Sequence, residues 1–179
     1  LADWSANVGM VSDYHFRGVQ QTQSASASAG VDYEQGGFYA GTWAAEVEDG
    51  LEVDFYAGYG IELDNGFSLG LGVTTYQYTG GFDTSYDELN LSAGFGIFGF
   101  EYTLGTHEDG ITDDNEMVIG DADYSFTGIS ADLGKGFGAT VGFFGKDWGG
   151  EYAEVTYGTS VGEFDVGVGL VMSGSDLDD

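Results

Sequence analysis

The stretch LEVDFYAGYGIEL, residues 51–63, decides the fold of this chain because its apolar and polar residues alternate. One face receives Leu51, Val53, Phe55, Ala57, Tyr59, Ile61 and Leu63, while the acids and both glycines fall on the other face. Successive side chains of a β-strand point to opposite faces of the sheet, so a period of two predicts a strand. A helix, with about 3.6 residues per turn, would not separate the two sets.

The same alternation recurs over 67–73, 89–97 and 164–172, and tight corners with an aromatic step separate many of these segments. The corners are Gly37-Phe38, Gly66-Phe67, Gly99-Phe100, Gly136-Phe137 and Glu163-Phe164. Longer acidic loops lie between the corners. Short turns at one end and long loops at the other are typical of an up-and-down antiparallel barrel. We expect the corner aromatics to form a belt at the short-turn end, joined by Trp4, Tyr33 and Phe98.

Strand counting predicts about eleven strands of ~9 to 13 residues, a length that suits a tilted membrane strand. They are expected at 3–16, 25–34, 37–47, 51–63, 67–78, 86–97, 100–107, 122–133, 137–147, 151–161 and 164–173. Long loops are expected at 17–24, 79–85, 108–121 and 148–150. Bacterial single-chain barrels have even strand numbers, so we expect a twelfth, closing strand that this sequence lacks. The other interpretation is that one strand has been split or merged.

The orientation of the two faces separates a membrane barrel from a soluble protein. The polar face is rich in glycine and acid, while the apolar face carries aromatic residues at the strand ends. This pattern favours lipid outside and a polar lumen inside. A soluble sandwich with an acidic exterior stays open, because alternation alone is symmetric between the two arrangements. The predicted fold class is therefore all-β, an up-and-down transmembrane β-barrel.

Composition narrows the function. The 179 residues include 33 glycines, no proline, no cysteine, and 31 acidic against 3 basic side chains, for a net charge of −28. No apolar run approaches the ~20 residues of a membrane-spanning helix. Nucleic-acid binding is excluded as a function class, because phosphate recognition needs many cations. The chain also has no disulfide framework.

Residues of the polar face are candidates to line a pore. The candidates are Asp13, His15, Asp32, Glu52, Asp54, Tyr56, Tyr76, Glu88 and Asn90. Acid outnumbers base among them, and rings of carboxylates in a pore favour cations. The alternative is that these carboxylates only make the interior of a small barrel polar, with hydrogen bonds to tyrosine and threonine.

Acidic loops suggest a second kind of site. Asp109, Asp113, Asp114 and Glu116 are weak calcium candidates, because Ca²⁺ binds several carboxylate oxygens. Their spacing does not match an EF-hand loop, and a solvated acidic loop is the competing interpretation. We expect no enzyme activity and no other cofactor, since two rim histidines do not make a catalytic site.

Several motifs in the first 105 residues resemble the TorF-type porins, outer-membrane proteins of proteobacteria. The motifs are SANV at 5–8, VSDYHFRGV at 11–19, QT at 21–22, GFYAGTW at 37–43, EVDFYAGY at 52–59 and YDEL at 86–89. The resemblance implies an outer-membrane location and a pore. It implies neither a particular solute nor catalytic residues. Family members usually continue into a final strand, which agrees with the expected missing strand.

Together these features predict a single outer-membrane β-barrel domain over 1–179, C-terminally incomplete, in a Gram-negative bacterium. We expect a porin for passive diffusion of small solutes that prefers cations. Its expected partners are outer-membrane lipid and lipopolysaccharide, with Arg17, Lys135 and Lys146 as the available cationic contacts; a homo-oligomer is left open. The alternative function is a self-assembling cell-surface or extracellular fibre subunit that uses unpaired sheet edges and acidic loops.

Overall fold

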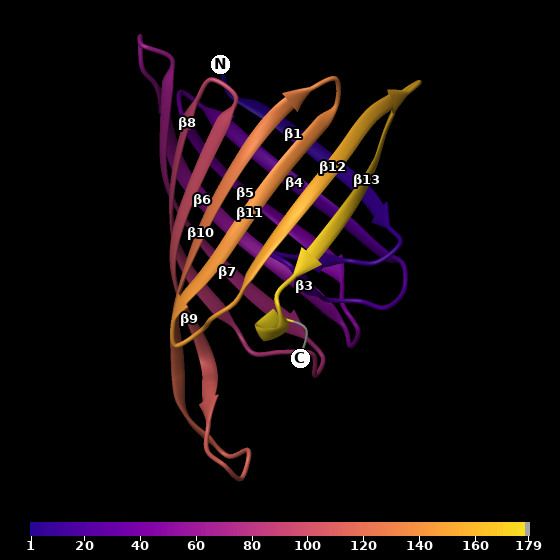
Figure 1. The fold of residues 1–179 in the computed structure, drawn as a ribbon. Coiled ribbons are helices and arrows are strands. Elements are labelled where there is room, and N and C mark those ends of the chain that lie inside the picture. Colours follow the sequence, from indigo (N-terminus) through magenta and orange to yellow (C-terminus); the bar gives the residue numbers. More distant parts are fainter. Residues whose placement is uncertain (178–179) are drawn as a thin grey trace.

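The chain forms one large antiparallel sheet curled into a barrel, as a computed structural model of residues 1–177 shows (Figure 1). Asp178 and Asp179, part of the predicted domain, lie outside the described residues. The strands of the sheet, in spatial order, are β1 (Asp3–Val11), β4 (Ser26–Gln35), β5 (Phe38–Glu46), β6 (Leu51–Glu62), β7 (Phe67–Thr79), β8 (Tyr86–Phe95), β9 (Phe98–Thr112), β10 (Val118–Gly134), β11 (Phe137–Lys146), β12 (Glu151–Val161) and β13 (Phe164–Ser173). Each strand of this sheet pairs with the next strand of the sheet in chain order, so the up-and-down topology predicted from sequence is confirmed.

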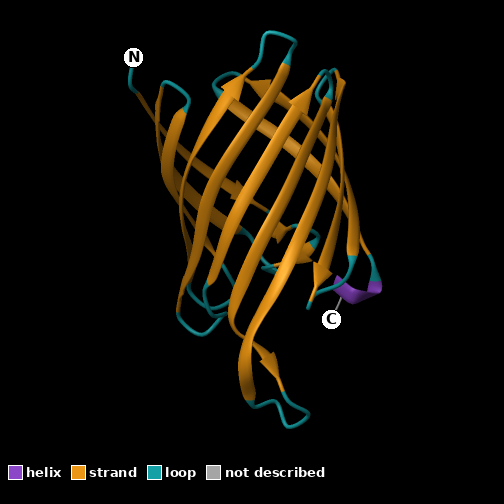
Figure 2. Cartoon of the chain, turned by 90° about the vertical axis from the view of Figure 1, so that its left-hand side faces the viewer, coloured by secondary structure: helices purple, strands orange, loops and turns teal. Residues whose placement is uncertain are grey.

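Two of the predicted segments differ from the structure. The first strand ends at Val11, and residues 12–25 leave the wall and turn into the barrel as a short hairpin of β2 (His15–Phe16) and β3 (Val19–Gln20). The segment 108–121, predicted as a loop, is mostly strand. There β9 and β10 continue past the other strands, and Figures 1 and 2 show their hairpin projecting at the end that holds the short helix η1 (Ser175–Leu177). Apolar and polar residues do not alternate regularly over 108–121, so the sequence pattern did not predict strands there.

The apolar face of the sheet points outward. Phe55, Leu71 and Val73 expose about half of their surface, at 51%, 52% and 55%. The alternate residues of each strand point inward, and among them Glu52 and Glu88 are only 1% and 4% exposed. A soluble protein would bury the large apolar side chains and expose the acids. The inverted arrangement is the one expected for a barrel with lipid outside.

Aromatic residues gather at the short-turn end of the outward face. Phe67 stacks on Phe95 with ring centroids 4.3 Å apart, and Trp4 packs against Tyr33 at 4.9 Å. One corner lies earlier than predicted: the turn between β8 and β9 is at 96–97, so Phe98 follows it directly.

The glycines of the inward face provide room for inward-pointing tyrosines. A Cβ placed on Gly58 or on Gly72 would lie 2.3 Å from the Tyr39 hydroxyl, which crosses above both. Glycine is the residue that permits so close an approach of another side chain to the backbone. Tyr39 therefore points into the barrel and Phe38 points outward, at 43% exposure.

The two edge strands, β1 and β13, each pair with a single neighbour within residues 1–177. The expected closing strand stays a prediction. None of the helical structure described here is long or apolar enough to cross a membrane.

Candidate functional site

The segment 12–25 forms the centre of the candidate site, because it folds into the lumen rather than over the rim. Its hairpin turns at Arg17 and Gly18, whose φ angles are 48° and 83°. Two consecutive residues with positive φ are typical of the tight turns that join antiparallel strands, and glycine adopts such a conformation at little cost. The amide of Gln21 donates to the Tyr14 carbonyl at 2.7 Å, and the Tyr14 amide donates to Thr22 Oγ1 at 2.9 Å. We call residues 12–25 the inward segment.

The inward segment contacts opposite walls of the barrel. Near its start, the Tyr14 hydroxyl donates to Glu52 Oε1 at 3.0 Å on β6. At its tip, Ser173 on β13 donates through Oγ to the Gly18 carbonyl at 2.5 Å. These contacts join strands that lie far apart in the order of the sheet. The inward segment therefore crosses the lumen.

Arg17 holds the tip of the inward segment to β8 and β9. Its guanidinium forms a bidentate pair with Glu88, with Nη1 to Oε1 at 2.5 Å and Nη2 to Oε2 at 3.2 Å. Nη2 also donates to Glu101 Oε1 at 2.8 Å. The Arg17 side chain is 9% exposed, that of Glu88 is 0% and that of Glu101 is 42%. Arg17 and Glu88 are thus a buried ion pair, whereas Glu101 faces open space.

Glu88 accepts further hydrogen bonds that orient it. Tyr76 and Tyr124 donate their hydroxyls at 3.1 and 2.6 Å, and Asn90 donates its amide at 3.0 Å. Both oxygens of the carboxylate are therefore engaged by protein donors. Such a network compensates for the loss of hydration that a buried charge suffers.

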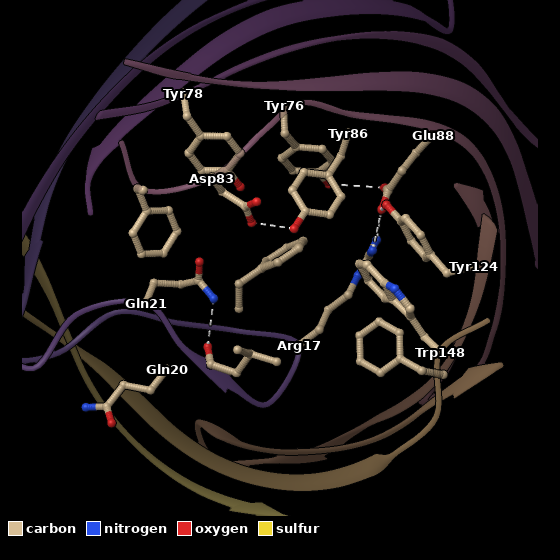
Figure 3. A pocket seen from close by; sticks show the side chains of 14 residues that line it. Arg17, Gln20, Gln21, Tyr76, Tyr78, Asp83, Tyr86, Glu88, Tyr124 and Trp148 are labelled. Carbon is tan, nitrogen blue, oxygen red and sulfur yellow. Dashed lines mark hydrogen bonds and ion pairs between the residues drawn. The ribbon is translucent and has the colours of Figure 1, made fainter. Parts of the chain in front are cut away.

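Two cavities lie on either side of this pair. One, of about 780 Å³, is lined by residues of the barrel interior such as Tyr56 and Asn90. The other, of about 230 Å³, lies beside the loops 80–85 and 147–150. Phe16, Arg17 and Tyr76 line both cavities. These three residues therefore lie between the loop side and the interior; Figure 3 labels Arg17 and Tyr76 among the residues around the loop-side cavity.

The residues predicted to line a pore separate into groups. Glu52 and Asp54 are buried and line none of the cavities described here, and one oxygen of Asp54 has no hydrogen-bond partner among residues 1–177. Asp32 accepts the Tyr56 hydroxyl at 2.5 Å. Tyr76 and Asn90 donate hydrogen bonds to Glu88 in the interior. Asp13 and His15 form a pair in the inward segment, with His15 Nδ1 and Asp13 Oδ2 3.2 Å apart.

The structure removes Arg17 from the cations available at the surface. The sequence analysis counted Arg17 among the possible contacts to lipopolysaccharide, but it lies in the lumen, where two carboxylates and two aromatic rings surround its guanidinium. A signal was present in the sequence: Arg17 is the only basic residue before Lys135. A lone cation followed by glycine, among so many acids, is a candidate for an internal ion pair.

The calcium candidates do not form a cluster. Among residues 1–177, no three His, Asp or Glu side chains are grouped as a metal site would require. Asp113 instead accepts backbone amides of Met117 and Asn115, and these hydrogen bonds lower the pKa of its carboxyl. Calcium binding by Asp109, Asp113, Asp114 and Glu116 stays a prediction.

The loop 80–85 carries Asp83, whose carboxylate accepts several hydrogen bonds beside the loop-side cavity. Burial acts to raise the pKa of Asp83, but hydrogen bonds from His107, Tyr86 and the Thr84 amide outweigh it, so the pKa is lowered. His107 Nε2 lies 3.0 Å from Asp83 Oδ1, and its ring stacks on Tyr86 with centroids 4.0 Å apart. Asp83 is therefore a carboxylate at neutral pH.

The fold and the lumen define a class of protein: an up-and-down β-barrel with an apolar exterior and an inward segment across its interior. The chain belongs to the family described as "Bacterial protein of unknown function (Gcw_chp)", which matches residues 2–134. A comparison with curated proteins finds no match.

The chain is also similar to solved porin structures. OprD of Pseudomonas aeruginosa is 15% identical with a TM-score of 0.46, over 98% of this chain and 62% of that one. OccK2 (OpdF) of Pseudomonas aeruginosa, solved in complex with glucuronate, is 12% identical with a TM-score of 0.47, over 93% and 56%. A variant of OccD1 (OprD) is 14% identical with a TM-score of 0.47, over 98% and 61%. The chain thus spans about three fifths of the length of these structures, and at this similarity they add nothing to the argument from its own residues.

Proposed function

We propose that the chain is a porin of the Gram-negative outer membrane, with a lumen that passes small solutes and prefers cations. One observation carries the proposal: an outward apolar face surrounds a polar interior that contains a cavity of about 780 Å³. An apolar exterior is stable only against lipid or another apolar surface. The resemblance to TorF-type porins supports the same location.

The inward segment sets the character of the proposed pore. It narrows the lumen at Phe16, Arg17 and Tyr76, so solutes pass beside a constriction rather than through an open channel. The hydrogen bonds to Glu88 fix that constriction in place. We therefore expect low conductance and selectivity for small solutes.

The proposed cation preference rests on carboxylates other than Glu88 and Glu101, which are paired with Arg17. A third cavity, of about 470 Å³, opens near the short turns and is lined by Asp3, Glu34 and Glu62, with no basic residue among its lining. These three acids are exposed. Acidic side chains at the mouth of a pore raise the local concentration of cations.

Reversal potentials in a salt gradient test this preference. The double substitution Glu34→Gln and Glu62→Gln should shift the reversal potential toward zero, because it removes two negative charges at the mouth. Glu163→Gln, at the corner between β12 and β13, is the matched control that removes a charge outside the cavity lining. An unchanged potential in the double variant would refute the proposed selectivity.

Cysteine labelling in intact cells tests the proposed location, since the native chain has no cysteine. Long loops of outer-membrane barrels face the exterior and short turns face the periplasm. A membrane-impermeant maleimide should therefore label Glu116→Cys in the long β9–β10 hairpin but not Lys135→Cys in the short β10–β11 turn. Equal labelling of both, or of the second alone, contradicts the orientation.

A fibre subunit was the other function considered from sequence. No observation specific to it favours that function, and the broad outward apolar face would oppose it in water. Solubility without detergent would favour the fibre.

A further inference from the structure

The loop-side cavity is lined chiefly by aromatic side chains. These aromatic residues include Tyr76, Tyr78, Phe82, Tyr86, Tyr124 and Trp148. Figure 3 shows Tyr76, Tyr78 and Tyr86 on one side of this space, with Tyr124 and Trp148 beside them and Arg17 and Gln21 across from them. We call the space bordered by these six residues the aromatic vestibule. It is a candidate for recognition by ring faces.

The four tyrosine hydroxyls of the vestibule all donate to carboxylates. Tyr76 and Tyr124 donate to Glu88, Tyr78 donates to Glu52 at 2.9 Å, and Tyr86 donates to Asp83. Their protons are therefore committed to the protein. A phenol that donates to a carboxylate gains electron density, which makes the face of its ring more attractive to a cation.

The glutamines of the lining add little donor capacity. The side-chain amide of Gln20 donates to the Thr22 carbonyl at 2.9 Å, and that of Gln21 donates to the Val19 carbonyl at 3.2 Å. The vestibule thus offers carboxylates, side-chain amide oxygens and ring faces, whereas the hydroxyl protons of its four tyrosines and one N–H of each glutamine are engaged. A sugar needs donors and acceptors in similar number, and an anion needs donors, so this lining suits a cation best.

The balance of charge favours the same class of ligand. Asp83 and Glu88 are the acids of the lining, and Arg17 is its only basic residue. The Arg17 guanidinium is already paired with Glu88 and Glu101. It also lies 4.8 Å from the Phe16 ring centroid and 4.4 Å from that of Phe126, so this lumen already holds one cation against aromatic faces.

The size of the vestibule limits the ligand. Its volume is about 230 Å³. Pockets for drug-sized molecules usually measure about 300–1,000 Å³, so this one suits a smaller group. A weakly hydrated ion with methyl groups fits an aromatic lining better than a metal ion, which requires several oxygen ligands.

We propose that the aromatic vestibule binds a small methylated ammonium ion, with its methyl groups against the rings of Tyr86 and Trp148 and its charge near Asp83. Binding at this site does not depend on conduction through the barrel. The two can therefore succeed or fail separately.

Calorimetric titration of the full chain in detergent with tetramethylammonium tests the proposal. We expect saturable binding, and we expect neopentyl alcohol, a neutral probe of similar shape, to bind at least about tenfold more weakly because a cation is attracted to ring faces and a neutral group is not. No heat with tetramethylammonium at 100 mM, about a hundredfold above an ordinary weak-ligand Kd of 1 mM, would overturn the proposal. Equal binding of the neutral probe, or saturable binding of glucose in place of the cation, would also overturn it.

Two substitutions locate the site. Trp148→Leu should weaken tetramethylammonium binding about tenfold, whereas Trp4→Leu, on the outward face, should leave it unchanged. Asp83→Asn keeps the shape of the side chain, and it should lower the affinity for tetramethylammonium but not the affinity for neopentyl alcohol. This variant tests the site even if Trp148→Leu does not fold. An equal loss in Trp4→Leu, or an unaltered affinity in Asp83→Asn, would contradict the assigned site.

Discussion

Replacing Glu88 by glutamine tests the internal ion pair most sharply. Glu88 has a fully buried side chain and accepts two bonds from Arg17, together with bonds from two tyrosines and Asn90. Glutamine has nearly the same shape but no charge, and its amide nitrogen cannot accept. The substitution therefore leaves the buried guanidinium of Arg17 with the half-exposed Glu101 as its remaining charged partner.

The magnitude follows from burial. Removing one partner of a buried pair costs about 3–5 kcal/mol, since the other charge stays buried without compensation. One amide oxygen still accepts a hydrogen bond, so we expect the loss to fall near the lower end of that range. Glu101→Gln is the matched control: it removes the second carboxylate from the same guanidinium, but at an exposed position where an ion pair contributes about 0–1 kcal/mol.

Unfolding in guanidinium chloride, followed by tryptophan fluorescence in detergent, measures both variants. The unfolding midpoint should fall clearly for Glu88→Gln and hardly for Glu101→Gln. Adding Arg17→Met to Glu88→Gln should recover part of the loss, because it removes the unpaired charge. Equal midpoints for the two single variants, or no recovery in the double variant, would refute the buried-pair account.

Three further predictions concern the inward segment and its surroundings. Gly18→Ala should destabilise the protein by about 1–3 kcal/mol more than Gly36→Ala, measured by the same unfolding assay; both positions have positive φ, but a Cβ at Gly18 would lie 2.6 Å from Tyr152 and one at Gly36 would meet nothing. Phe16→Ala should raise single-channel conductance, since Phe16 lines the narrow point, and a conductance equal to that of the wild type would contradict that role. Asp83 has a lowered pKa, so its contribution to stability is present above about pH 3.9 and is lost as the pH falls through its folded pKa; the unfolding midpoints of wild type and Asp83→Asn should differ at neutral pH and converge in acid.

The wall of the barrel could be predicted from sequence because alternation is a local signal. Residues 51–63 separate their faces without reference to any other part of the chain, and the predicted segments 151–161 and 164–173 coincide with β12 and β13. Four of the five predicted corners are equally local and lie where expected, whereas Gly99-Phe100 falls inside β9. Local patterns thus gave the strands, their order and the outward direction of Phe55 and its neighbours.

The interior could not be predicted in the same way because it depends on contacts between distant residues. Arg17 and Glu88 are 71 positions apart, and nothing in the local sequence pairs them. The alternation of residues 3–11 continues weakly into 12–16, which hid the point where the chain leaves the wall. The acids were predicted either to line a pore or to accept hydrogen bonds from tyrosine and threonine inside the barrel; Glu52 and Glu88 accept such bonds from tyrosines, and Glu88 also accepts them from Arg17.

Single-channel recording in a planar bilayer tests the central claim most directly. The full chain should be compared with a variant in which residues 15–20 are replaced by a glycine–serine linker of equal length. If the barrel is a pore narrowed by its inward segment, the full chain conducts in small steps and the linker variant in larger ones. Insertion of both proteins without any conductance would contradict the account.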